Sequence, residues 1–142
     1  MANNSASTPI FDGIWFRPHL VTPNDATPAA GAQSNNGIPP GVKVVEVGAV
    51  TNDANDWITL PDIADVPVGH EITILCNAGS NFELRTPAAS NTKINNQDCD
   101  GTKEYLCTDT EIVKVVKLNN TTGWVAWAFT ALGAKAAAVV PD

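Results

Sequence analysis

The sequence contains two histidines, the residue type whose usual pKa suits proton transfer near neutral pH. His19 follows a proline, and His70 stands beside Glu71. No Ser or Cys nucleophile motif accompanies either histidine, and the sequence has neither paired zinc-ligand spacing nor a glycine-rich phosphate loop. We therefore predict that each is a surface histidine or a hydrogen-bonded structural one, and we expect no cofactor and no enzymatic activity. A pocket lined by His70 with Glu71 or an Asp would favour an enzyme instead.

One stretch resembles a metal-binding loop. Residues 96–101, N-Q-D-C-D-G, match the opening of a calcium loop, in which alternating oxygen ligands precede a glycine. The twelfth position counted from Asn96 is Cys107, where such loops place a bidentate Glu. The pattern therefore favours a turn rich in Asn and Asp, and we expect no metal site.

The three cysteines cannot all pair within the chain, because their number is odd. Cys76 lies on the apolar side of an alternating run and is expected to be a small buried hydrophobic residue. Cys99 and Cys107 are eight residues apart and could form a disulfide. Three free thiols in a reducing cytoplasm are the favoured interpretation.

Aromatic side chains are the other candidates for a functional role. Trp124 and Trp127 are three residues apart, so in a regular strand they face opposite sides. One of them is expected in the core and the other at a subunit interface or a ligand platform. A second apolar group near the N-terminus is expected to pack on the domain itself, on a sister subunit or on another protein; it consists of Ile10, Phe11, Ile14, Trp15 and Phe16.

The elements that position these residues are predicted to be strands. Residues 70–77 alternate, with Ile72 and Ile74 on one side and Glu71 and Thr73 on the other. Further runs of strand length, separated by turn signals, occur at residues 42–50, 57–60, 80–86, 93–95, 102–107, 111–118 and 124–129. Short strands at this spacing predict an all-β fold, an antiparallel β-sandwich or small barrel.

The chain divides into three parts by composition. Residues 1–41 contain six of the ten prolines and are predicted to form an extended, Pro-rich N-terminal arm and linker. Residues 42–130 are predicted to form the β domain. Residues 131–142 combine Ala and Val with Gly133 and Pro141, which predicts a short C-terminal arm.

Charge restricts the classes of partner. The formal net charge is −7, and the eight Lys and Arg residues are scattered. Phosphate backbones and anionic lipid surfaces are bound by clustered cations, so we expect neither nucleic acid nor membrane as a partner. The N-terminal residues lack the features of a signal peptide, and no apolar run approaches about 18 residues. We therefore expect a soluble protein made in the cytoplasm.

Several short motifs between residues 57 and 128 resemble a pattern found in small β-structured virion proteins of tailed bacteriophages. In that pattern a T-L-P strand leads to G-(D/E)-x-I-x-I-x-N-x-G, then to an I-N-G turn and a terminal Trp. Asn96 stands where the pattern often has Gly. The matching segments are I-T-L-P (58–61), V-G-H-E-I-T-I-L-C-N-A-G (68–79), N-F-E-L-R-T-P (81–87), K-I-N-N-Q-D (93–98) and G-W-V-A-W (123–127).

This resemblance implies a function. Proteins of this kind include capsid decoration (cement) proteins and head or tail fibre domains. By resemblance, the chain is expected to be a non-enzymatic homotrimer that binds the major capsid protein on the outer surface of the virion and stabilises the shell. The alternative is a head or tail fibre module that binds a host-surface glycan. The N-terminal apolar group is the expected capsid or inter-subunit contact.

Overall fold

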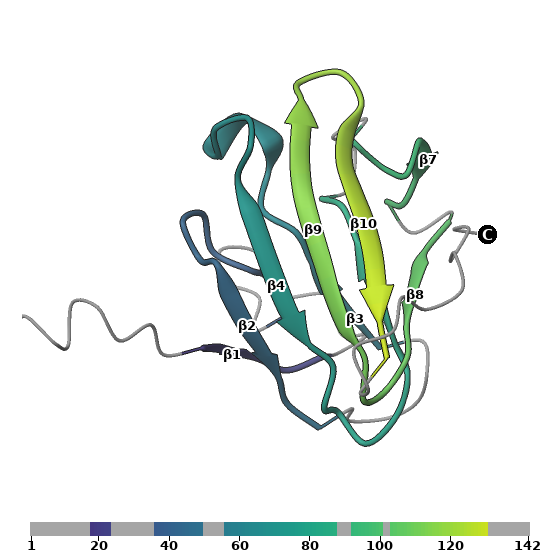
Figure 1. Ribbon diagram of the computed structural model, residues 1–142. Helices are drawn as coiled ribbons and strands as arrows, with labels where there is room; N and C mark the ends of the chain where they lie inside the picture. Colours follow the sequence, from purple (N-terminus) through teal and green to yellow (C-terminus); the bar gives the residue numbers. More distant parts are fainter. Residues whose placement is uncertain (1–17, 24–35, 50–55, 88–91, 101–102, 131–142) are drawn as a thin grey trace, which may run out of the picture.

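The computed structural model describes residues 18–23, 36–49, 56–87, 92–100 and 103–130, which form two β-sheets (Figure 1). The all-β class is therefore confirmed. A short 3₁₀ turn, η2 (Ile63–Asp65), precedes β4. The smaller sheet has the order β3 (Trp57–Thr59), β5 (Phe82–Arg85) and β8 (Tyr105–Cys107). The larger sheet has the order β1 (His19–Val21), β2 (Val44–Val47), β4 (Glu71–Leu75), β9 (Ile112–Asn119), β10 (Gly123–Phe129), β6 (Lys93–Ile94) and β7 (Gln97–Asp98).

The expectation of purely antiparallel pairing is wrong. Strands β4, β9 and β10 pair antiparallel, as do β5 with β8 and β6 with β7. Four other pairs are parallel: β1 with β2, β2 with β4, β3 with β5, and β6 with β10. From β2 to β5 the chain changes sheet at every strand. A strand that returns after crossing to the other sheet therefore lies beside its predecessor and points the same way.

The longest pair, β9 and β10, forms a hairpin whose turn follows from its residues. The Asn119 side-chain oxygen accepts hydrogen bonds from the backbone N–H groups of Thr121 (2.8 Å) and Thr122 (2.6 Å). Gly123 has a φ of +80°, and a Cβ placed there would lie 2.6 Å from the carbonyl oxygen of Lys93. Glycine is required at this position because only it permits both the turn and the close approach of β6.

The hydrophobic core draws side chains from both sheets. Trp124 and Ile74 come from the larger sheet, while Phe82, Leu84 and Tyr105 come from the smaller one, and all are buried. Strands β4, β5, β8, β9 and β10 contribute alternate residues, as the sequence pattern predicts for strands with one face in the core. The opposite face of each sheet therefore remains available for other contacts.

Parts of the predicted N-terminal arm pack with the β structure. His19–Val21 pairs with β2 as strand β1, and Val21 is fully buried. Ile38 is also buried and donates its backbone N–H to the Thr59 carbonyl oxygen at 2.8 Å. The proline-rich composition of residues 1–41 does not indicate which of their short segments pair with a strand. Residues 1–17 and the predicted C-terminal arm, 131–142, lie outside the described residues.

Candidate interaction surface

The two tryptophans of β10 separate as the spacing predicts. Trp124 is fully buried, and its ring meets the His70 ring edge to face, with centroids 6.5 Å apart. Trp127 lies on the opposite side of the strand and is partly exposed. Trp124 is therefore a core residue and is excluded as an exposed platform, which leaves Trp127 as the candidate. The predicted contact residues Ile10, Phe11, Ile14, Trp15 and Phe16 lie outside the described residues.

Strand register assembles Trp127 with other side chains on the outer side of the larger sheet. Trp127 pairs with Lys114, which pairs with Thr73, which in turn pairs with Val44. Nine of the thirteen side chains on this side of strands β1, β2, β4, β9 and β10 are apolar. We call this surface the apolar face; it consists of Leu20, Val44, Glu46, Glu71, Thr73, Leu75, Ile112, Lys114, Val116, Leu118, Val125, Trp127 and Phe129.

Within the apolar face, one row of side chains is almost entirely hydrophobic. Leu20 lies next to Glu46 across β1 and β2, and Glu46 lies next to Leu75 across β2 and β4. Ile112 and Phe129 continue this row across β9 and β10. Leu20, at the β1 end of the row, is 62% exposed, and Ile112 in β9 is 37% exposed, so water reaches large apolar groups in this row.

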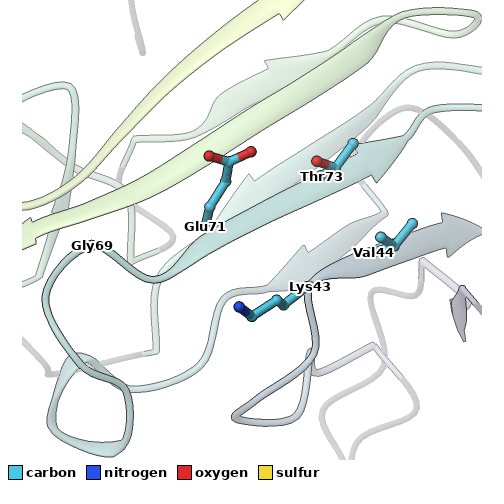
Figure 2. A pocket seen from close by; sticks show the side chains of 5 residues that line it. All are labelled: Lys43, Val44, Gly69, Glu71 and Thr73. Carbon is cyan, nitrogen blue, oxygen red and sulfur yellow. The ribbon is translucent and has the colours of Figure 1, made fainter. Parts of the chain in front are cut away.

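The polar groups of the apolar face border a shallow hollow (Figure 2). The hollow has a volume of about 490 Å³ and is lined by Lys43, Val44, Gly69, Glu71 and Thr73. Figure 2 shows Glu71 and Thr73 projecting from β4 on the same side as Val44 from β2. The Glu71 carboxylate also accepts a hydrogen bond from Lys114 Nζ at 2.9 Å. The hollow thus offers a hydroxyl, an ammonium group and a carboxylate that is already paired.

His70 does not line this hollow. It is buried, and its Nε2 lies 3.1 Å from the Val42 carbonyl oxygen, which makes it the hydrogen-bonded structural histidine that the sequence predicts. In this hollow Glu71 lies without His70, so the hollow does not have the arrangement of a histidine with a carboxylate that would favour acid–base chemistry. The His70 ring packs against Trp124 and so connects the residue before β4 with β10, which lies on the far side of β9.

Lys117 is a buried charged residue that was not predicted from the sequence. Lys117 occupies an inward position of β9 and is only 3% exposed. Its ammonium group donates to the carbonyl oxygen of Ile63 and, at 2.6 Å, to that of Val66. The alternation of residues 111–118 places this lysine among the inward-facing residues, and this pattern could have indicated that it is buried. Its role is to hold the 63–66 segment against β9, because both carbonyls are satisfied by one cation.

The cysteines are three free, buried thiols, as favoured from the sequence. Burial raises the pKa of the Cys99 thiol from 9.0 to about 11. Burial and a hydrogen bond with Cys76 raise the pKa of the Cys107 thiol. The structure therefore brings Cys107 next to Cys76, whereas the sequence suggested Cys99 as its possible partner. Protonated, buried thiols are poor nucleophiles.

The segment that resembles a calcium loop is built differently. Asn95 and Asn96 have φ values of 50° and 68° and form a two-residue turn between β6 and β7, a conformation that Asn tolerates. The Asn95 amide also exchanges two hydrogen bonds of 2.9 Å with the backbone of Ala126. Within the described part of the chain, no group of three or more His, Cys, Asp or Glu side chains could hold a metal ion.

The outer side of the smaller sheet has a different character. Arg85 stacks over the Trp57 ring, with its guanidinium carbon 4.1 Å from the ring centroid. Its Nε donates to the Glu83 carboxylate at 2.9 Å, and its Nη2 lies 3.6 Å from Glu104. We call this surface the charged face; it consists of Trp57, Thr59, Glu83, Arg85 and Leu106, with Glu104 at its border. Most of its polar groups are satisfied within the chain.

Comparison of the chain with protein-family models, with curated proteins and with solved structures finds no match. Among the described residues, no helix has the length and apolar character needed to cross a bilayer. The two outer faces and the short motifs of the sequence are therefore the features of this chain that bear on its function.

Proposed function

We propose that this chain is a capsid decoration protein of a tailed bacteriophage, a non-enzymatic β-sandwich that assembles as a homotrimer on the outside of the shell. In this proposal the module binds the major capsid protein after assembly and stabilises the virion. A protein that binds the assembled lattice more tightly than free subunits adds its binding energy to the stability of the shell.

The apolar face is the observation that best supports this proposal. A sheet whose outer side has nine apolar residues among thirteen offers a surface suited to protein contacts. Such a surface is typical of a binding module. The short motifs between residues 57 and 128 add the resemblance to phage virion proteins. The N-terminal group from Ile10 to Phe16 is the proposed contact with the capsid.

The direct test is to locate the protein. Virions encoded by the genome that carries this chain would be purified, stripped of the protein with mild denaturant and re-incubated with purified protein. We expect re-binding to the outer surface, seen by electron microscopy with an antibody, and a higher melting temperature of the particles. Deletion of residues 1–17, which ends before strand β1, should abolish re-binding. Absence of the protein from purified particles would refute the proposal.

A host-glycan-binding fibre module is the second candidate. The partly exposed indole of Trp127 favours it, because sugars stack on such rings, and the polar hollow lies on the same face. A glycan array probed with the full chain and with Trp127→Ala tests this candidate. Binding that is lost in the variant would support it, and an array without hits for the full chain would remove it.

A further inference from the structure

Two buried thiols lie next to each other between the sheets, and the proposed function uses neither of them. Cys76 directly follows β4 of the larger sheet, and Cys107 is the last residue of β8 in the smaller sheet. The two residues are 2% and 0% exposed, and a hydrogen bond joins their thiols. Both belong to the hydrophobic core cluster. The pair therefore connects the two sheets, although both thiols are free.

Backbone hydrogen bonds hold the two cysteines close to each other, independently of their thiols. The Cys76 carbonyl oxygen accepts a hydrogen bond from the Thr110 N–H at 2.6 Å, and the Cys76 N–H donates to the Glu111 carbonyl oxygen at 2.9 Å. Thr110 is three residues beyond Cys107 in the chain. Cys107 is itself paired with Phe82 of β5. The contact between the thiols is therefore set by the strands that carry them.

The third cysteine, Cys99, has different neighbours. Its thiol lies against the Ile94 backbone, and the carboxylates that act on it are those of Glu104, Asp98 and Asp100. It is fully buried, like the other two thiols. Cys99 is therefore a matched control for the pair, because it has the same chemistry and burial in another part of the core.

A disulfide suits the position of the pair in the core. A thiol carries a donor hydrogen that an apolar interior satisfies poorly, whereas a disulfide has no donor. The bond between Cys76 and Cys107 would close a loop of about 30 residues, and closing a loop of this length lowers the entropy of the unfolded chain. Oxidation should therefore stabilise the folded protein.

We infer that Cys76 and Cys107 are an oxidisable pair, which a small peroxide converts into a disulfide between the two sheets. The inference does not depend on the proposed function, because it concerns the core and not the outer faces. In a reducing cytoplasm the pair stays as two thiols. In an oxidising environment the disulfide locks the larger sheet to the smaller one.

The reaction balances with hydrogen peroxide as the oxidant. The sulfur of one cysteine attacks a peroxide oxygen as the O–O bond breaks, which gives a sulfenic acid and one water molecule. The second sulfur then attacks the sulfenic sulfur, so that the S–S bond forms, the S–O bond breaks and a second water molecule leaves. The two thiols lose two electrons and two protons, and the peroxide gains them. Because buried, protonated thiols react slowly, the first step requires local opening of the core.

Oxidation of the purified full chain with hydrogen peroxide tests the inference. At about pH 8 we expect the number of thiols that react with iodoacetamide in denaturant to fall from three to one. Peptide mapping by mass spectrometry should place the new disulfide between Cys76 and Cys107. The melting temperature should rise by about 5–10 °C and return to its starting value with dithiothreitol. Cys107→Ala should abolish the disulfide, whereas Cys99→Ala should leave its formation unchanged.

Several outcomes would overturn the inference. A disulfide between Cys99 and Cys107, a disulfide between two copies of the chain, or three thiols that persist after prolonged oxidation would each refute it. A disulfide of the expected pairing that does not raise the melting temperature would refute its stabilising role. Circular dichroism checks that each variant folds, and mapping of the unmodified chain decides the pairing even where a variant does not fold. No virion is used, so failure here and failure of virion binding are distinguishable.

Discussion

The outer faces of the two sheets differ in kind, although both cover the same hydrophobic core. On the smaller sheet, Arg85 stacks on Trp57 and pairs with Glu83, so the charged face satisfies its own groups. On the larger sheet, Trp127 and Phe129 have no such polar cover among the described residues, and Ile112 is open to water. The outer side of the smaller sheet therefore has the composition of a solvent-exposed surface, whereas the outer side of the larger sheet has the apolar composition of a protein–protein interface.

This difference separates stability from function. Inward residues of both sheets are buried to a similar degree, because every strand must contribute to one core. Outward residues need not fill the core, so their polarity indicates whether each face contacts water or another molecule. Stability should therefore be most sensitive at inward positions of either sheet, and contacts with other molecules at outward positions of the larger one.

Replacement of the two tryptophans of β10 should produce the largest difference. Trp124→Ala removes a fully buried indole and should lower the free energy of unfolding by about 3–5 kcal/mol. Trp127→Ala removes a partly exposed one and should cost about 1 kcal/mol. Urea denaturation followed by circular dichroism measures both at a concentration where the chain is monomeric. Equal costs would mean that the apolar face is part of the core.

Alkaline pH should lower the free energy of unfolding, because ionisable groups are buried between the two sheets. Burial raises the pKa of Cys99 to about 11, and it also raises the pKa values of Cys107 and Tyr105. Above about pH 9 the unfolded chain releases protons that the folded chain retains, so stability that is complete below pH 9 falls as pH rises further. We expect the melting temperature to fall by several degrees between about pH 9 and 11.

Tyr105→Phe provides the control for this pH effect. The variant keeps the buried ring but loses the ionisable hydroxyl, so its melting temperature should fall less steeply at the alkaline end. A decline as steep as that of the unmodified chain would show that the phenol takes no part in it.

On the charged face, Arg85→Met should affect stability but not binding to the virion. Methionine can still pack on Trp57, while the cation–π contact and the ion pairs with Glu83 and Glu104 are lost. We expect a loss of about 1 kcal/mol in the free energy of unfolding. Re-binding to stripped particles should be unchanged. Weaker re-binding of this variant would contradict the division between the two faces.

The smallest effect is expected for the ion pair on the apolar face. Lys114 and Glu71 are both well exposed, so Lys114→Met should change the free energy of unfolding by at most about 0.5 kcal/mol. If the apolar face contacts another protein in the virion, the same variant should still alter re-binding to stripped particles. A stability loss as large as that of Arg85→Met would mean that the two faces are built alike.

Much of the strand content could be predicted. The alternation in residues 70–77 and 111–118 matches β4 and β9, and the Asn119–Gly123 turn lies where turn residues cluster. These features depend on neighbours in the sequence, since side chains two residues apart share a face. The parallel pairs could not be predicted, because strand direction depends on which sheet the chain enters next. Strand β1 could not be predicted either, because its three residues lie in a proline-rich segment and are too few to show an alternation of their own.

The sequence by itself determined that Trp124 and Trp127 face opposite sides and that the fold is built from short strands, and it favoured free thiols while leaving a Cys99–Cys107 disulfide open. Only the tertiary structure decided which tryptophan is buried, that Lys117 holds the carbonyls of Ile63 and Val66, and that Leu75, Ile112 and Phe129 form one row. The physical reason is that alternation is a property of a single strand, whereas a face is assembled from strands that lie far apart in the sequence.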